Sequence, residues 1–336
     1  MSLVRRAKPA AAPMHVALLG TGLLGGAIGR RLLERGHRLT AWNRHPERLA
    51  PLLTPGPDGA RASAAGSAAE AVAAAGAEGW VVTVLADGAA TATVLLDQAG
   101  ARLGRRRVLQ MGTIGPEESR RLAQAVGERG GRWLEAPVLG SRPEALAGRL
   151  QIMAGGPADL FDQALPLLRD LGPCPRRLGP VGCGLEAKLA LNQLIASLTH
   201  AFSLSLHLAT AAGIDPEAFM ELLRGSALHA PTFDKKLGRM LTDDYGDPNF
   251  PTAHLRKDLL LFLDSARRHG LTVAGLECLG ALLERAAGSP LDDLDYSALH
   301  RLTGPAGRAR PPAPPRGNGS PPESSSPPPP GIPGPG

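Results

Sequence analysis

Aromatic side chains are scarce in this chain of 336 residues, making up 3% of it, although 43% of its residues are apolar. The core must therefore be mainly aliphatic and closely packed. Cysteine is also rare, and Cys174, Cys183 and Cys278 have neither metal-ligand spacing nor the even number of a complete disulfide set. We therefore expect a protein of the reducing cytoplasm without a bound metal.

Long apolar runs are missing as well. No stretch resembles a transmembrane span, so we expect no membrane partner. The first residues lack the apolar core of a signal peptide, and we interpret residues 1–13 as a disordered leader. Residues 304–336 are dominated by Pro, Gly and Ser, which predicts a disordered tail. A proline-rich ligand for some partner is the alternative interpretation of this tail.

The net charge of +6 could indicate a nucleic-acid partner. However, the arginines are spread along the chain, and the densest run, at 105–107, directly precedes a strand-like segment. We interpret that run as a solvated turn. Because no base-stacking or basic-arm motif accompanies it, we expect no nucleic-acid partner.

Short apolar runs alternate with helix-like segments from His15 to about Leu178. The alternation predicts an α/β domain, residues 14–178, with a mainly parallel sheet covered on both faces. The strand-like runs are 15–20, 38–43, 79–86, 107–112, 132–137 and 150–155, and the helix-like segments include 23–35 and 116–129.

The strand pattern stops after Val181. Residues 181–212 predict one long helix, and shorter helices are predicted at 216–224, 253–269 and 273–287. We therefore expect an all-α C-terminal domain, residues 179–303, built on the long interdomain helix.

Gly20, Gly22 and Gly25 form the pattern G-x-G-x-x-G directly after the first strand-like run and at the start of a helix. The first glycine permits a tight turn, the second lets the backbone approach a pyrophosphate, and the third allows close helix packing. The helix N-terminus then favours the phosphates electrostatically. The motif predicts a Rossmann dinucleotide site, to which we also assign Leu23, Leu24 and Leu85.

The end of the second strand-like run indicates which dinucleotide binds. Asn43 and Arg44 stand where an NAD-preferring site usually has an acid for the ribose hydroxyls. An acid there would repel a 2′-phosphate, whereas an arginine attracts it and can bond it in two places. We therefore expect NADP(H) as the cofactor; an ordinary surface arginine is the alternative.

Lys188 is the only formally charged residue within 187–214, if histidines are neutral, in a segment rich in leucine. Burying an unpaired ammonium is costly, so this lysine must snorkel to water, pair with another group or take part in the function. Asn192 lies four residues later and therefore shares its helix face. His200 and His207 follow on the same helix, but without a third ligand we interpret them as core or interface residues.

Gly140 and Ser141 lie in a loop between a strand-like run and another helix or turn. Such a loop offers backbone N–H groups and a hydroxyl to an anionic substrate. By itself it would also pass as an ordinary turn.

With the glycine motif, this loop and "VGCGLEAKLALNQ" in order, the chain from about residue 15 to 302 resembles the β-hydroxyacid dehydrogenase family. The family has a 6-phosphogluconate dehydrogenase-like fold and includes 3-hydroxyisobutyrate dehydrogenases and NADPH-dependent glyoxylate and succinic semialdehyde reductases. The "WNR" ending and the Gly-Ser pair look most like the reductase branch. The family motifs fall on Gly182, Gly184, Lys188 and Asn192 (G-x-G-x-x-x-K-x-x-x-N), on Thr113 (the cofactor-contacting threonine) and on Lys257 (the K-D motif).

The chain departs from the family pattern at three positions. Leu139 replaces the usual serine of the anion loop, Gly112 replaces the serine of a Ser-Thr pair, and Gln193 replaces a second asparagine. Losing the hydroxyl at position 139 removes one possible substrate contact. This departure bears on substrate identity more than on the chemistry.

The resemblance implies an NADPH-dependent reduction of a small carboxylated aldehyde or keto acid to the hydroxy acid. Lys188 would supply the proton as hydride reaches the carbonyl carbon, and Asn192 would orient the lysine or the substrate oxygen. Gly140 and Ser141 would hold the substrate carboxylate, and Lys257 would close over the cofactor. The resemblance also implies a homodimer or higher homo-oligomer that pairs through the helical domain.

Three alternatives remain open from the sequence. One is a 3-hydroxyisobutyrate-type dehydrogenase that runs in the oxidative direction. A second is an imine reductase, although such relatives often carry Asp or Tyr at the position of Lys188. The third is a noncatalytic NADPH-binding scaffold, which would bind the cofactor without turnover.

Overall fold

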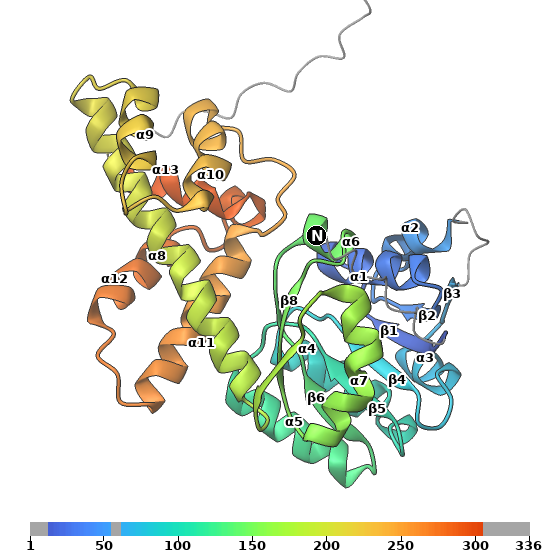
Figure 1. Ribbon diagram of the computed structural model, residues 1–336. Coiled ribbons are helices and arrows are strands. Elements are labelled where there is room, and N and C mark those ends of the chain that lie inside the picture. The colour runs from blue at the N-terminus through green and yellow to red at the C-terminus, as the bar shows by residue number, and fades with distance from the viewer. Residues whose placement is uncertain (1–12, 55–61, 305–336) are drawn as a thin grey trace, which may run out of the picture. The chain divides into compact units, whose positions relative to one another are not determined.

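The computed structural model of the chain describes residues 13–54 and 62–304, and Figure 1 shows its α/β part and its helical part. Apart from Pro13 and Gly304, the leader and the tail expected from composition lie outside the described residues. The expected fold class is confirmed, since a mainly parallel sheet with helices precedes an all-helical segment.

The sheet has the strand order β3-β2-β1-β4-β5-β6-β8-β7, with β9 paired to β8. The strands from β3 to β6 along this order are parallel; β8 is antiparallel to both β6 and β7, and parallel to β9. The strand bounds are β1 His15–Leu19, β2 Arg38–Trp42, β3 Ala62–Ala64, β4 Trp80–Thr83, β5 Arg107–Gln110, β6 Arg132–Glu135, β7 Val138–Leu139, β8 Gln151–Gly155 and β9 Arg176–Gly179.

All six predicted strands are present, and three short ones were missed. Strands β3, β7 and β9 have three, two and four residues. They carry too few apolar residues to form a recognisable run, because edge strands need little burial to pair. The missed strand β7 leads directly into the predicted anion loop.

Alternating residues of β1 show why helices lie on both faces of the sheet. Val16 and Leu18 belong to one buried apolar cluster, and Ala17 and Leu19 belong to another. A strand buried on both sides needs a helical layer on each face. The helices of this part are α1 Leu23–Glu34, α2 Ala50–Leu53, α3 Ala68–Ala74, α4 Gly88–Ala92, α5 Pro116–Glu128, α6 Arg142–Leu146 and α7 Ala158–Leu171.

Strand β1 pairs with β2 on one side and with β4 on the other, so the strand order reverses at β1. The loops that leave β1 and β4 therefore diverge at the carboxyl edge of the sheet. Ligands of doubly wound sheets bind at such a switch point. The glycine motif follows β1 at this edge.

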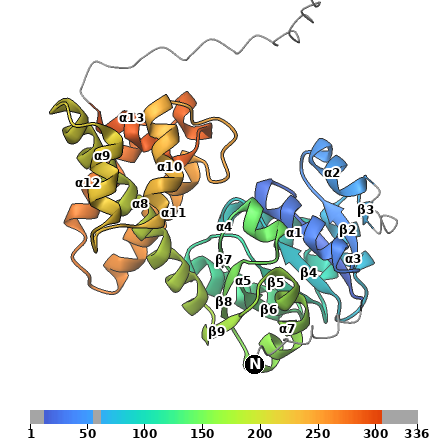
Figure 2. The same cartoon turned by 45° about the horizontal axis from the view of Figure 1, so that its top comes forward.

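The helical part is built on α8, Cys183–Ala211, which packs along α11 and also contacts β8 (Figure 2). The predicted long helix and the three shorter ones are confirmed to within a few residues, and α10 was missed. The remaining helices are α9 Pro216–Arg224, α10 Pro231–Thr242, α11 Thr252–Arg268, α12 Ala274–Glu284 and α13 Leu299–Thr303.

By length and composition alone, α8 is long and apolar enough to cross a membrane. The expectation that no stretch resembles a membrane span therefore needs correction on those two criteria. One side of α8 forms the buried core with α11 and α13, and another side leaves leucines such as Leu194 and Leu208 exposed. A long core helix of a helical domain has the same composition as a membrane helix.

Candidate active site

The glycine loop after β1 has the geometry that the sequence predicts. Gly20 has φ +95°, and a Cβ there would lie 2.3 Å from the carbonyl oxygen of Val84. A Cβ at Gly25 would lie 2.1 Å from the carbonyl oxygen of Gly20, whereas nothing lies within 4 Å of a Cβ at Gly22. Two glycines thus permit the turn and the helix contact, and Gly22, the N-cap of α1, is open for the approach of a phosphate.

Asn43 ties the end of β2 to this glycine loop. Its Nδ2 donates to Oγ1 of Thr21 at 3.0 Å, and its Oδ1 accepts from the N–H of His45 at 2.9 Å. The next residue, Arg44, is exposed. Among residues 13–54 and 62–304, no ion pair or hydrogen bond to its guanidinium is found, so the charge is free for a phosphate.

The loops after β4 and β5 meet beside the glycine loop. A Cβ at Gly112 would lie 2.7 Å from the carbonyl oxygen of Leu85, so the serine usual at this position would need the loop to move. The ammonium of Lys257, on α11, donates to the carbonyl oxygen of Thr113 at 2.5 Å. The structure therefore brings together three predicted cofactor residues, Leu85, Thr113 and Lys257, from distant parts of the chain.

Glu135, at the end of β6, fixes the start of α8. Its buried Oε1 accepts hydrogen bonds from the N–H groups of Gly182, Gly184 and Leu185 at 2.8, 2.9 and 3.2 Å. A carboxylate at this end also interacts favourably with the helix dipole. Burial raises the pKa of Glu135, against the effect of these hydrogen bonds and of one from Ser119. Sequence analysis did not predict a role for Glu135. The signal that could have revealed it is a single acid within the apolar run "RWLEAP".

Gly184 lets α8 begin directly against the sheet. A Cβ at this position would lie 2.4 Å from the carbonyl oxygen of Met153 in β8. Only a glycine allows this contact without displacing one of the two backbones. The position of Lys188, one turn later, therefore depends on the contact between Gly184 and β8.

Lys188 is 7% exposed, and its ammonium is paired. Its Nζ donates to Oδ1 of Asn192 at 2.7 Å, Nδ2 of Asn192 donates to Oδ2 of Asp258 at 2.5 Å, and Nζ of Lys257 lies 2.8 Å from Oδ1 of Asp258. The prediction that Lys188 and Asn192 share a face is confirmed. Asp258 was not predicted, although the K-D motif placed it next to Lys257.

The surroundings of Lys188 make its proton exchangeable near neutral pH. Burial lowers the pKa of Lys188 from 10.5 to about 8; the charge of Asp258 opposes this shift and the charge of Lys257 adds to it. Such an ammonium stays mostly protonated at neutral pH but can release its proton. The group is thus suited to exchange a proton with a bound molecule.

The predicted anion loop joins β7 to α6. Gly140 has φ +122°, which favours glycine, and both N–H and Oγ of Ser141 donate to Oε2 of Glu144 at 2.8 Å each. Strands β7 and β8 contact α8, so the loop leaves the sheet beside the helix that carries Lys188. Gln193, the departure next to Asn192, donates instead to Oγ of Ser197 one turn further along α8.

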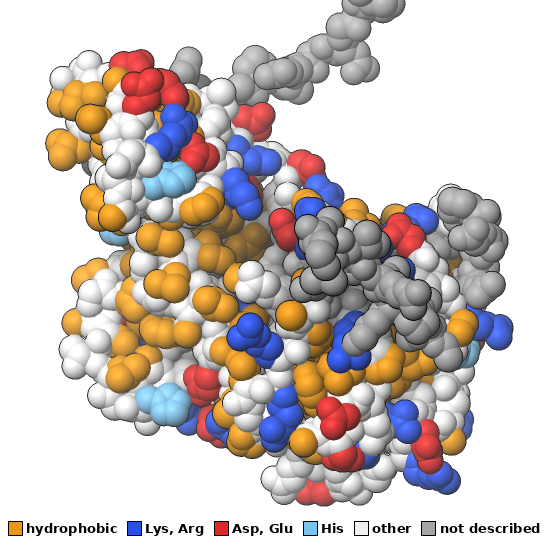
Figure 3. Space-filling model, in the orientation of Figure 1, with side chains coloured by type: hydrophobic (Ala, Val, Ile, Leu, Met, Phe, Trp, Pro, Cys, Tyr) orange, Lys and Arg blue, Asp and Glu red, His pale blue; other side chains and the backbone are white. Residues whose placement is uncertain are grey.

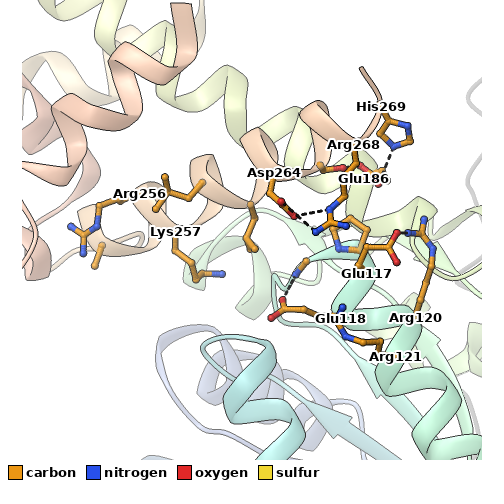
Figure 4. A pocket seen from close by; sticks show the side chains of 16 residues that line it. Glu117, Glu118, Arg120, Arg121, Glu186, Arg256, Lys257, Asp264, Arg268 and His269 are labelled. Atoms are coloured by element: carbon orange, nitrogen blue, oxygen red, sulfur yellow. Dashed lines mark hydrogen bonds and ion pairs between the residues drawn. The ribbon is translucent and has the colours of Figure 1, made fainter. Parts of the chain in front are cut away.

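A pocket of about 700 Å³ lies between α5 and α11 and includes Lys257 (Figure 4). Four of its charged side chains form two pairs: Arg268 with Asp264, and Arg120 with Glu117. Lys257 is its single predicted site residue. The pocket therefore borders the predicted site without containing Lys188.

Two of the other polar residues have structural partners. His207 stacks on His300 with ring centroids 3.8 Å apart, as expected for a core or interface histidine. Asp292 pairs with Arg256. In the described part of the chain, no group of three His, Cys, Asp or Glu residues could hold a metal ion.

Comparisons with known proteins agree with this geometry. The family described as the NAD-binding domain of 6-phosphogluconate dehydrogenase matches residues 15–179, and that of NADP-dependent 3-hydroxyisobutyrate dehydrogenase matches residues 182–303. Glyoxylate/succinic semialdehyde reductase 1 of Arabidopsis thaliana is 31% identical over 85% of this chain and 97% of its own length. The 3-hydroxyisobutyrate dehydrogenase of Pseudomonas aeruginosa is 30% identical over 85% of this chain and 97% of its own length.

A solved structure shows the same fold at lower identity. The 3-hydroxyisobutyrate dehydrogenase of Mycobacterium tuberculosis, described with L-serine, superposes with a TM-score of 0.74 at 23% identity and covers 86% of this chain and 99% of its own. The matched segments span both the dinucleotide-binding sheet and the helix with Lys188. The chain therefore belongs to the β-hydroxyacid dehydrogenase family, as an oxidoreductase that binds NAD(P).

Proposed function

We propose that the enzyme reduces a small carboxylated aldehyde or keto acid to the hydroxy acid with NADPH, and that Lys188 donates the proton. The observation that carries this proposal is the buried pair of Lys188 and Asn192, 2.7 Å apart, on the helix that begins against the dinucleotide-binding sheet. NADPH, when bound, supplies the hydride for the carbonyl carbon.

The ammonium of Lys188 stabilises the charge that grows on the carbonyl oxygen during reduction. One of its three N–H bonds points to Asn192, so the others are available to the substrate oxygen. With a pKa of about 8, the group is both a hydrogen-bond donor and a proton donor at neutral pH. An arginine would hold the charge but could not release the proton.

Asp258 sets the orientation of the Asn192 amide. Because Nδ2 of Asn192 donates to Asp258, its Oδ1 must face Lys188. This arrangement holds the ammonium at one place on α8 without neutralising it directly. Asp258 thus acts as a positioning residue.

The free guanidinium of Arg44 supports NADPH rather than NADH. It follows directly on Asn43, which is bonded to the glycine loop, and so lies at the end of β2 where the adenosine ribose is expected. The matched family of residues 182–303 is described as NADP-dependent, which supports the same choice.

The names of the relatives support the substrate class. The reductase from Arabidopsis acts, by its name, on glyoxylate and succinic semialdehyde, and both are small carboxylated aldehydes. The 3-hydroxyisobutyrate dehydrogenase from Pseudomonas favours a second candidate, oxidation of a hydroxy acid. In that direction, neutral Lys188 would accept the proton of the alcohol.

We also propose a cytoplasmic homodimer formed through α8. The exposed face of α8 carries a row of leucines, and Figure 3 shows hydrophobic side chains gathered over the helical part. Exposed apolar patches of this kind mark protein contacts. The leucines are Leu194, Leu198, Leu204 and Leu208, with Leu208 73% exposed.

The test is NADPH consumption with a panel of carbonyl compounds. The panel contains glyoxylate, succinic semialdehyde, methylmalonate semialdehyde, tartronate semialdehyde and a cyclic imine. The variants are Lys188→Ala and, as a control on the same helix, Gln193→Ala. We expect turnover of a carboxylated aldehyde that is lost in Lys188→Ala, with NADPH binding retained, and kept in Gln193→Ala.

Other outcomes would redirect the assignment. Turnover of the imine alone would identify an imine reductase. Binding of NADPH without turnover of any compound would support a noncatalytic scaffold. Undiminished activity of Lys188→Ala would refute the role of the lysine.

A further inference from the structure

The anion loop of this chain already holds a carboxylate of its own. Oε2 of Glu144 accepts hydrogen bonds from both N–H and Oγ of Ser141, each at 2.8 Å. These are the two donors predicted to hold the carboxylate of the substrate. Glu144 therefore occupies, from within the chain, the position expected for the anionic end of a substrate.

Glu144 also covers the second predicted substrate residue. A Cβ at Gly140 would lie 3.0 Å from Cβ and 3.4 Å from Cγ of Glu144, so the aliphatic stem packs on this glycine. Both residues assigned to substrate binding thus contact the same side chain. A carboxylate from solution cannot bind Ser141 in this way while Glu144 stays in place.

The charge on Glu144 is retained at neutral pH. Although burial raises its pKa, the hydrogen bonds from Ser141 and the nearby charge of Lys235 outweigh that effect and hold the pKa of Glu144 below its usual value. The neighbouring cation, Arg142, is bonded to both carboxylate oxygens of Asp247 at 3.1 and 3.0 Å. Arg142 is therefore paired with Asp247 and does not neutralise Glu144. An incoming carboxylate is repelled by the negative charge of Glu144.

The departure at position 139 acts in the same direction. A serine there would offer a hydroxyl to an anion, and Leu139 offers none. The loop thus lacks the hydroxyl donor at position 139, and Glu144 occupies the two donors of Ser141. The loop should therefore bind a carboxylate less tightly than it would with a serine at position 139 and without Glu144.

Glu144 has a local structural role as well. Ser141 and Glu144 have the S-x-x-E spacing of a capping box, and Glu144 accepts from the N–H of the N-cap residue of α6. This role explains why the side chain is well placed, but it does not depend on a negative charge. A test must therefore separate the charge from the hydrogen bond.

We propose that Glu144 is a specificity-determining residue whose carboxylate competes with the substrate carboxylate for N–H and Oγ of Ser141. This inference rests on the proposed reduction of carbonyl compounds at Lys188. A carboxylated substrate must displace the Glu144 carboxylate from Ser141, and Lys235 is the cation near the displaced carboxylate. An uncharged carbonyl compound can bind without displacing Glu144. Glu144 thus weakens the binding of carboxylated substrates relative to uncharged ones of the same length.

The experiment compares Glu144→Gln with the wild type on succinic semialdehyde and on its uncharged amide. Glutamine keeps the acceptor for Ser141 but removes the charge. We expect the KM for succinic semialdehyde to fall about tenfold, since a like charge is removed from a partly desolvated contact. The KM for the amide and both kcat values should stay within about twofold, because Glu144 does not touch the reacting atoms.

A second glutamate in the first turn of a helix provides the matched control. Glu117→Gln on α5 removes an exposed carboxylate whose partner is Arg120, and should leave both KM values unchanged. If Glu144→Gln changes neither KM and lowers only the melting temperature, Glu144 is a helix cap and the inference is wrong.

Binding of succinate to the complex with NADP⁺ separates this inference from the proposed reaction. By calorimetry, Glu144→Gln should bind succinate about tenfold more tightly than the wild type, and the double variant with Ser141→Ala should lose the gain. This pattern would support the inference even if no aldehyde were reduced. Equal affinity in wild type and Glu144→Gln would overturn it even if Lys188-dependent turnover were found.

Discussion

The ammonium of Lys188 lies 2.7 Å from Oδ1 of Asn192, on the buried side of α8. The lysine has a pKa of about 8, and the charge of Asp258 raises that value against the effect of burial. Reduction needs the protonated form, so kcat/KM for a carbonyl substrate should fall as the pH rises through about 8. Oxidation of the hydroxy acid needs the neutral form and should rise over the same range.

Replacing Asp258 tests the cause of this pH dependence. In Asp258→Asn the stabilising charge is gone, so the alkaline limb of the reduction profile should move to lower pH. Asp264→Asn is the control, because it removes an exposed carboxylate from the same helix, where its partner is Arg268. If the limb stays in place in Asp258→Asn, another group governs it.

The burial of the charged Lys188 should lower the free energy of unfolding. Its folded pKa of about 8 is below the unfolded value of 10.5, so the unfolded state binds more protons between these values. Below about pH 8 the penalty is fully present, and it disappears as the pH rises toward 10.5. Lys188→Met should therefore raise the melting temperature by a few degrees at neutral pH.

Calorimetry at neutral and alkaline pH measures this effect. The advantage of Lys188→Met over the wild type should shrink as the pH rises. An advantage that is constant with pH would show that methionine merely packs better, and a loss of stability would show that the hydrogen bond to Asn192 outweighs the burial of the charge.

Arg44 should decide the preference for NADPH. In Arg44→Asp, the 2′-phosphate loses an attractive charge and meets a repulsive one. We expect kcat/KM for NADPH to fall on the order of a hundredfold, with little loss for NADH. Arg48→Asp removes another exposed arginine from the segment after β2 and should leave the ratio between cofactors unchanged.

The exposed face of α8 gives a prediction for the oligomeric state. If two copies pair through this face, Leu208→Glu places a charge inside the contact and should shift the enzyme toward the monomer in sedimentation measurements. Leu228→Glu is the control, since Leu228 is 77% exposed but lies outside α8. Equal masses for both variants and the wild type would exclude this face as the contact.

Local patterns in the sequence predict much of this molecule. The six strand runs and the glycine motif follow from periodicity and from backbone requirements that act within a few residues. Lys188 was found because one charge in an apolar helix is unusual. The spacing of four residues placed Asn192 on the same helix face, and its role as the partner of Lys188 came from the family resemblance.

The missed residues act across long distances in the sequence. Glu135 bonds to Gly182 and its neighbours, and Asp258 bonds to Asn192 from another helix. No local pattern states which acid reaches which donor, because the sheet order and the packing of α8 on α11 decide it. Glu144 is different: the S-x-x-E spacing was visible, but its overlap with the predicted substrate site needed the side-chain geometry.

Gly184 gives the last prediction, which links the fold to the site. A Cβ at Gly184 would lie 2.4 Å from the carbonyl oxygen of Met153, so Gly184→Ala must push α8 away from β8. The hydrogen bonds from α8 to Glu135 would then weaken. Lys188, which lies one turn after Gly184 on α8, would also move. We expect a loss of roughly 1–3 kcal/mol in the free energy of unfolding, together with a lower kcat.

Gly238→Ala in α10 provides the matched control for this substitution. Gly238 is also helical, and nothing lies within 4 Å of a Cβ built there. Because alanine favours the helix over glycine, this variant should gain about 0.5–1 kcal/mol in urea unfolding and keep its kcat. If Gly184→Ala were as stable and as active as Gly238→Ala, the contact with β8 would not be what positions Lys188.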